Sequence, residues 1–425
     1  MTSRERVLAS IKHQQPDRVP LDLGSCPTTG MHVSTVYLLR QALKLDEPDT
    51  PVKIIEPYQM LGEIKPDLRD VLGVDVVGVF PIQTALGINN ENWKEWELFD
   101  GTPVAVPGDF NTEPDENGDI YSWPGADRSV PASAKMPNGG FYFDTIVRQE
   151  PLDESKLDPA DNLEEYQPLS DENISYFKTE IDRLYTETDK AVMVNFGGTA
   201  FGDIAHVPAP SLKHPKGIRD IEEWYVSLVI RPDYIKEVFR RQSEIALANL
   251  QRLYAAIGDK EIIVYMSGTD FGTQKAPFMS LNTYKNLYLP YQKKLNDWIH
   301  ENTPWKTFQH SCGSVMPLIE GFIEAGFDIL NPVQTSAVNM DARELKKKFG
   351  KQITFWGGGI DSQKTLPFGT PDQVREAAEN NIKILCPGGG FVFNPIHNVQ
   401  ARVPVENLLA MYEAFEKHRN YKDIG

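Results

Sequence analysis

The residues that stand out for chemistry in this sequence are His310 and Cys312, in the segment QHSCG at 309–313. They follow a short apolar stretch from Trp305, which is typical of a buried strand. Residues two apart on a strand point the same way, so the imidazole and the thiol should lie side by side. Zinc prefers such ligands. The pair predicts a zinc site, against the competing interpretation of an inert packed thiol.

A third zinc ligand has two candidates, because a catalytic zinc takes three protein ligands and keeps one open position. Cys386 ends the run IKILC, and His397 lies in FNPIHNVQ. Spacing alone leaves this choice open. Asp270 ends another strand-like run, in YMSGTD, and is a candidate fourth ligand or general base.

Polar residues at other strand ends are candidates for substrate contact, namely Asn195, Gln274 and Gln334. Each could equally cap a helix or satisfy a loop. For Asp361 and Cys26, which hold similar positions, we favour structural roles, with Cys26 packed as a thiol under a loop.

Eight short apolar runs alternate with amphipathic helical patterns and would position these residues. Continuous apolar runs of this length suit a parallel sheet covered on both faces. The pattern predicts an α/β fold with residues 1–425 as a single (β/α)8 TIM-type barrel domain, whose site lies at the carboxyl ends of the strands. A doubly wound open sheet is the alternative. The runs are residues 19–24 and 74–82, and those starting at 191, 261, 305, 327, 353 and 389.

The stretch 90–168 breaks this rhythm. Its Asp-Gly and Asn-Gly pairs between alternating patterns are typical of β-hairpin turns. We predict a β-rich insertion in the barrel, following the second strand.

Bulk composition excludes several classes of protein. The net charge of −17 and the lack of a basic run argue against nucleic-acid binding. No run approaches the roughly 20 apolar residues of a membrane span, and the first residues form no apolar signal segment. Three widely spaced cysteines do not make a disulfide framework. We therefore expect a cytoplasmic enzyme with a small-molecule substrate.

Several segments resemble the uroporphyrinogen decarboxylase superfamily over nearly the whole chain. They are RERVLASIKHQQPDRVP, LRDVLGVDVVGVF, HSCGSVMPLIEGFIEAGFDILNPVQ, FWGGGIDSQKTLPFGT and PVENLLAMYEAF. One branch of that superfamily decarboxylates uroporphyrinogen III and carries an arginine-rich motif and a catalytic Asp. Here the matching segments are DLGSCPTTG, without arginine, and PIQTALG, without an acid. The resemblance therefore favours the other branch, zinc-dependent methyltransferases that work with corrinoid proteins.

In that branch an HxC pair and a later Cys hold zinc, so the resemblance implies zinc binding by His310 and Cys312. Aligned on PVENLLAMYEA, the family's later Cys falls on His397, and aligned on KILCPGGG it falls near Gly389. Cys386 matches neither alignment. The implied site is His310, Cys312 and His397, with Cys386 as the alternative third ligand.

The predicted function is transfer of a methyl group between a small methylated substrate or thiol and methylcobalamin, or another corrinoid, on a partner protein. Asp270 and His397 are the predicted catalytic groups. One alternative is a metal-independent lyase that uses them as acid and base on a carboxylated substrate. Another is a non-enzymatic tetrapyrrole or corrinoid binder. The resemblance also implies a homodimer.

Overall fold

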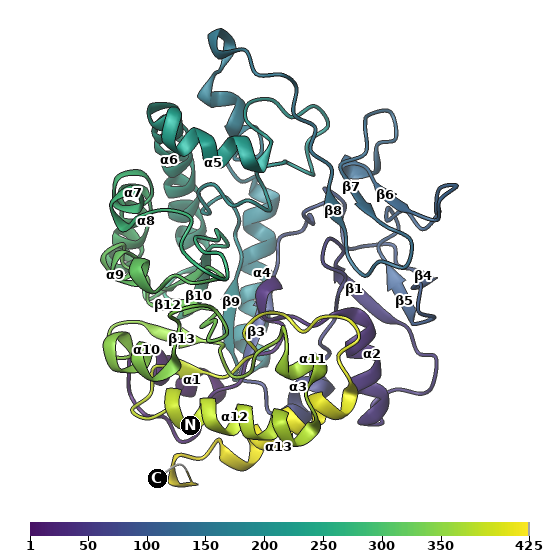
Figure 1. The fold of residues 1–425 in the computed structure, drawn as a ribbon, viewed down its shortest axis with the longest axis vertical. Coiled ribbons are helices and arrows are strands. Elements are labelled where there is room, and N and C mark those ends of the chain that lie inside the picture. The colour runs from purple at the N-terminus through teal and green to yellow at the C-terminus, as the bar shows by residue number, and fades with distance from the viewer. Residues whose placement is uncertain (424–425) are drawn as a thin grey trace.

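A curled sheet of seven parallel strands lies at the centre of the computed structural model, which describes residues 1–423 (Figure 1). Its order is β14-β13-β12-β11-β10-β9-β3, so each strand pairs with the next one along the chain. A doubly wound sheet would reverse that order, so this alternative is excluded. The strands are β3 (Val76–Val79), β9 (Ala191–Val194), β10 (Ile262–Ser267), β11 (Lys306–His310), β12 (Ile329–Asn331), β13 (Thr354–Trp356) and β14 (Phe391–Val392).

The predicted first strand, residues 19–24, is not a regular strand, and that prediction is corrected. Within it only Leu21 makes a β-bridge, with Phe393. Pro20 has no amide hydrogen to pair, and the Leu21 amide donates to the Asp75 carboxylate at 2.9 Å. The backbone nevertheless reaches both edges of the sheet, since Phe393 N donates to Pro20 O and Asp75 N to Leu21 O, each at 2.8 Å. The curled sheet is thus consistent with a TIM-type barrel.

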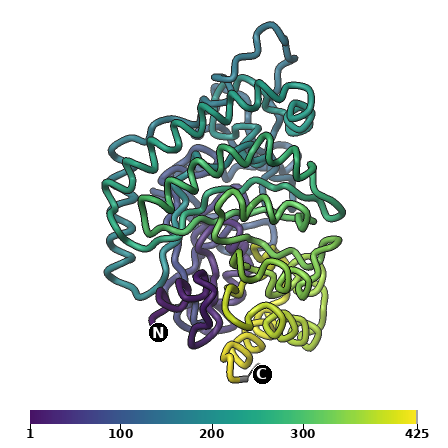
Figure 2. The backbone as a smooth tube through the Cα atoms, turned by 90° about the vertical axis from the view of Figure 1, so that its left-hand side faces the viewer, coloured from purple at the N-terminus to yellow at the C-terminus, as the bar shows by residue number. Residues whose placement is uncertain are grey.

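Helices follow the strands and cover the outside of the sheet (Figure 2). Several helices begin at a residue whose hydroxyl group caps the first turn. The hydroxyls of Ser170, Ser280 and Thr370 each accept a hydrogen bond from the backbone amide three residues later. Within residues 1–423, no helix has the length and apolar character to cross a membrane. The helices are α1 (Ser3–Ile11), α2 (Val33–Ala42), α3 (Pro66–Leu72), α4 (Asp171–Glu187), α5 (Ile221–Ile230), α6 (Pro232–Ile257), α7 (Leu281–Leu287), α8 (Leu289–Asn302), α9 (Ile319–Glu324), α10 (Ala342–Phe349), α11 (Thr365–Phe368), α12 (Pro371–Leu385) and α13 (Val405–His418).

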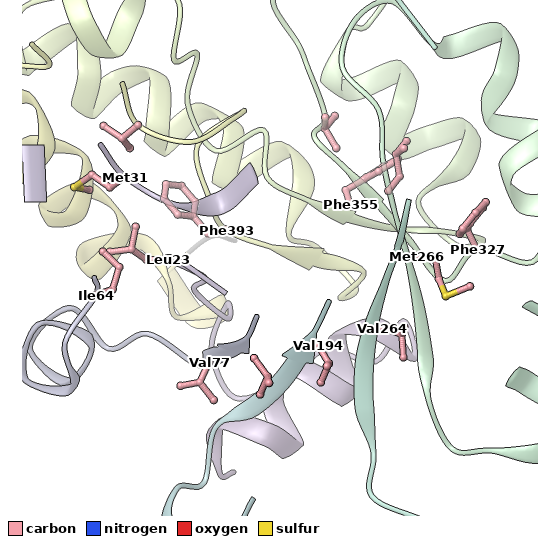
Figure 3. Close-up of a cluster of buried hydrophobic side chains, with 14 of the residues drawn as sticks. Leu23, Met31, Ile64, Val77, Val194, Val264, Met266, Phe327, Phe355 and Phe393 are labelled. Carbon is pink, nitrogen blue, oxygen red and sulfur yellow. The ribbon is translucent and has the colours of Figure 1, made fainter. Parts of the chain in front are cut away.

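Successive residues of the strands point to opposite faces of the sheet and therefore belong to two different apolar clusters. Val77, Val194 and Val264 belong to the large cluster shared with the helices (Figure 3). Their neighbours on the other face, such as Val76 and Met193, form a second cluster with one or more residues from each strand. This packing fixes the strand ends that carry the polar residues described below.

A β-rich region lies to one side of the central sheet (Figure 1). One small sheet has the order β2-β1-β5-β4 and the other β6-β7-β8. An Asp100-Gly101 turn joins β4 to β5, with Gly101 at φ +83°. Two of these strands, β1 and β2, precede residue 90. The strands are β1 (Val52–Glu56), β2 (Leu61–Gly62), β4 (Lys94–Glu97), β5 (Pro103–Val106), β6 (Ile120–Ser122), β7 (Ala134–Met136) and β8 (Asp144–Thr145).

Candidate functional site

Three of the residues singled out in the sequence lie together at the carboxyl end of β11. His310 ends that strand, Cys312 follows two residues later, and His397 comes from the segment after β14. One ligand atom from each lies within 4.8 Å of the other two. The Cys312 Sγ is 3.5 Å from the His310 Nε2, and the two imidazole rings meet edge to face at 5.3 Å. Two nitrogens and one sulfur at this separation form a donor set suited to zinc.

The tautomer of His310 is set by Asn331, which ends β12. The Asn331 Nδ2 donates to the Trp356 carbonyl at 2.9 Å, so its Oδ1 faces the imidazole. That Oδ1 lies 2.7 Å from the His310 Nδ1 and also accepts from the Thr28 hydroxyl at 3.1 Å. The Nδ1 must therefore carry the proton, which leaves the Nε2 lone pair directed at Cys312. Burial and the neighbouring His397 lower the pKa of His310 to about 3, so its ring is neutral.

His397 is held in the same manner by Asn398. The Asn398 Nδ2 donates to Gln59 Oε1 at 2.8 Å and to Pro27 O at 3.3 Å. Its Oδ1 lies 2.8 Å from the His397 Nδ1, which is thus the protonated nitrogen. Burial lowers the pKa of His397. Both imidazoles accordingly present an unprotonated Nε2, the form that a metal requires.

Asp270, in the loop after β10, borders this group. Its Oδ1 accepts the Cys312 amide at 2.6 Å and lies 3.5 Å from the His310 Nε2. Burial raises the pKa of Asp270, and the Cys312 amide opposes that shift. Burial and the Asp270 charge raise the pKa of the Cys312 thiol. A carboxyl group with a raised pKa beside the three donors is suited to holding a proton.

Cys386 is not among the residues brought together. It caps the end of α12, where its amide donates to Ile382 O at 3.0 Å, and its side chain is fully buried. Burial raises the pKa of this thiol to about 12. Cys26 is likewise buried, with its Sγ 3.2 Å from the Thr28 hydroxyl and its pKa raised by burial to about 11. Both thiols are packed groups.

The three predicted substrate contacts fall into two groups. Asn195 lines a cavity of about 460 Å³ beside His310, His397 and Asp270. Gln334 is buried and accepts the Gly313 amide at 2.6 Å, while its Nε2 donates to Gln274 Oε1 at 3.0 Å. This pair supports the turn after Cys312, where Gly313 has φ +92°, and it does not line the cavity.

The cavity also contains polar residues that sequence reasoning missed. Glu56 ends β1, which is not one of the eight runs expected for the barrel, so a search of the expected strand ends did not include it. Asp203 lies in the loop after β9, where attention to every acid following a strand would have found it. Tyr166 and Tyr265 complete this part of the lining, and burial raises the pKa of both phenols.

Comparisons with known proteins concern the family and the fold of this chain. The model of the family described as uroporphyrinogen decarboxylase (URO-D) matches residues 147–418. In sequence the chain is similar to the uroporphyrinogen decarboxylase of Prochlorococcus marinus, at 22% identity over 290 residues, 67% of this chain and 76% of that one. In structure it is similar to a methyltransferase from Methanosarcina mazei, with a TM-score of 0.54 and 14% identity over 98% of each chain. At that identity the structural likeness concerns the fold.

Proposed function

Because the chain belongs to the uroporphyrinogen decarboxylase family, we propose that it is a methyltransferase of that family. It would transfer a methyl group between a heteroatom of a small substrate and a corrinoid carried by a partner protein, with zinc held by His310, Cys312 and His397. The observation that carries the proposal is the convergence of these three donors within 4.8 Å.

The donor set fits zinc in chemistry as well as in spacing. Each imidazole has its Nδ1 committed to an asparagine oxygen at 2.7 or 2.8 Å, which leaves the Nε2 for a metal. Three protein donors leave a fourth position for substrate. When bound, zinc would act as a Lewis acid on the substrate heteroatom that loses or gains the methyl group.

Asp270 would hold the proton that this transfer requires. In demethylation, the corrinoid would accept the methyl group without its bonding electron pair, and the substrate heteroatom would keep that pair and gain a proton. A protonated Asp270 can supply that proton and become a carboxylate, and it takes the proton back in the reverse direction. Its raised pKa, caused by burial, favours the protonated form.

A metal-independent lyase is the second candidate, and one observation favours it. Asp270 and His397 line the same cavity, and burial shifts their pKa values in opposite directions, upward for the acid and downward for the base. Such a pair is suited to acid and base roles. Activity that survives chelation, with no loss in Cys312→Ser, would favour the lyase.

Metal analysis of the purified protein tests the proposal. We expect about one zinc per chain, lost in Cys312→Ser and retained in the matched control Cys386→Ala, which alters a buried thiol outside the site. Methyl transfer to a corrinoid protein, followed by the visible absorption of cobalt, should follow the zinc content. A folded wild type that takes up no zinc from zinc-replete medium would contradict the proposal, as would equal zinc in both variants.

A further inference from the structure

The cavity beside the three donors has an unbalanced set of charges. Among the residues 1–423 that the structure describes, its lining contains no lysine and no arginine. It contains four carboxylates, from Glu56, Glu165, Asp203 and Asp270. It also contains three imidazoles, from His206, His310 and His397, and the last two belong to the three zinc donors. The surface that meets a ligand is therefore acidic.

Two of the four carboxylates are accounted for by neighbouring groups. Glu165 forms an ion pair with Arg219, with the Nη1 2.7 Å from its Oε1. Asp270 accepts the Cys312 amide. A zinc ion with the Cys312 thiolate carries a net charge of about +1, which Asp270 would balance when it is ionised. Glu56 accepts the Tyr58 amide at 3.3 Å and the Gln59 amide at 2.8 Å, and burial raises its pKa. Neither Glu56 nor Asp203 has a lysine or arginine partner in the lining.

Asp203 is the more informative of these two residues. Its side chain lines the cavity, and the residue is only 7% exposed. Its Oδ1 accepts the Ala205 amide at 3.0 Å. Its Oδ2 and the Tyr265 hydroxyl both border Gly268, where an added Cβ would lie 2.7 Å from the first and 2.8 Å from the second. No lysine or arginine within residues 1–423 forms an ion pair with it, so its charge is available to a ligand in the cavity. A ligand cation would pair with that charge.

Aromatic rings share this lining. Tyr58, Phe80, Tyr166 and Tyr265 all face the cavity. Ring faces attract ammonium cations, most strongly where water is excluded. Carboxylates combined with ring faces recognise a positively charged nitrogen, and they disfavour an anion of the same shape.

We propose that the substrate of this cavity carries a cationic ammonium group, which lies among Asp203, Glu56 and the tyrosine rings. The methyl group would be on a separate oxygen or sulfur atom facing the three donors, because an ammonium nitrogen has no lone pair for zinc. The assignment as a methyl-bearing substrate rests on the proposed methyltransferase function. The preference for a cation rests on the cavity itself. Anionic substrates, including carboxylates, would meet like charge with no lysine or arginine in the described lining to compensate.

Three probes of one shape test the proposal: choline, neutral 3,3-dimethylbutan-1-ol and anionic 3,3-dimethylbutanoate, titrated calorimetrically into the zinc-loaded full chain. We expect choline to bind at least about tenfold more tightly than the alcohol, and the carboxylate most weakly. Equal affinity for choline and the alcohol, or tightest binding of the carboxylate, would overturn the proposal.

Three variants test which residues cause the preference for choline over the neutral alcohol. Asp203→Asn should weaken choline binding about tenfold and leave the alcohol unchanged, whereas Glu376→Gln, an exposed acid on α12, should change neither. Tyr166→Leu should weaken choline several-fold, which gives a second reading should Asp203→Asn fold poorly. A choline preference that survives in Asp203→Asn would overturn the assignment. Zinc content in the same samples reports separately on the proposed function, because a protein without zinc can still discriminate the three probes.

Discussion

Two parts of the cavity lining are built by different means. The metal-donor part takes His310 from a barrel strand, and its orientation is fixed by Asn331 at the end of the neighbouring strand. The acidic part takes Glu56 from a short strand of the β-rich region and Asp203 from a loop. The comparison teaches that the ends of neighbouring barrel strands fix the orientation of His310, while the β-rich region and a loop supply the charge that would select a ligand.

The largest effect should come from the proton-holding residue of the metal-donor part. Asp270→Asn removes the acid but keeps an oxygen that can accept the Cys312 amide. We expect kcat for methyl transfer to fall by about 10²–10⁴-fold with zinc content unchanged, because Asp270 is not one of the three donors. Single-turnover kinetics and metal analysis measure the two quantities.

Asp361→Asn is the matched control for Asp270→Asn, since Asp361 accepts the Gln363 amide at 3.0 Å in the loop after β13. It should leave kcat unchanged. Full activity in Asp270→Asn would contradict the assignment of proton transfer to the metal-donor part of the lining.

A smaller effect should come from the residue that orients His310. Asn331→Ala removes the acceptor that fixes the Nδ1 proton, so either ring nitrogen can then face Cys312. We expect zinc affinity to fall by about 10–100-fold, as measured by competition with a chromophoric chelator. The exposed Asn302→Ala on α8 should bind zinc as the wild type does, and an unchanged affinity in Asn331→Ala would remove the proposed orienting role.

The smallest effect should come from the β-rich region. Gly101 has φ +83° in the β4–β5 turn, and the position that an alanine methyl group would take there is open space. Gly101→Ala should therefore lower the free energy of unfolding by about 1 kcal/mol through backbone strain alone. Thermal or urea unfolding measures this, and zinc binding should not change. A loss of zinc on this substitution would show that the two regions are coupled.

Much of this arrangement was accessible from the sequence. The family resemblance is confirmed, and seven of the predicted apolar runs contain the strands of the central sheet. The period of a strand led to the expectation that His310 and Cys312 share one face. In the structure β11 ends at His310, and Cys312 lies beside it just beyond the strand. The prediction of a strand at residues 19–24 was wrong because the sequence pattern of a buried apolar run does not show what its amides bond to. The Leu21 amide donates to a carboxylate and not to a neighbouring strand.

The features of the site that the sequence did not predict depend on contacts between residues far apart in the chain. Whether His397 or Cys386 lies near Cys312 depends on how the chain turns after α12, and local spacing does not encode that turn. Gln334 has the polar character of a substrate contact, yet it is used by the Gly313 amide. Glu56 and Asp203 come from segments whose place relative to the barrel is fixed only by tertiary packing.

The contact between Thr28 and Asn331 also bears on the order of folding. These two residues are 303 positions apart in the chain, and the bridge from Leu21 to Phe393 spans a still longer separation. Contacts between such distant residues form slowly, because the intervening chain must first be ordered. The hydrogen bonds that position His310 are therefore complete only after the two ends of the barrel have met. During refolding, the rate at which zinc becomes tightly bound should then report the rate of that final closure.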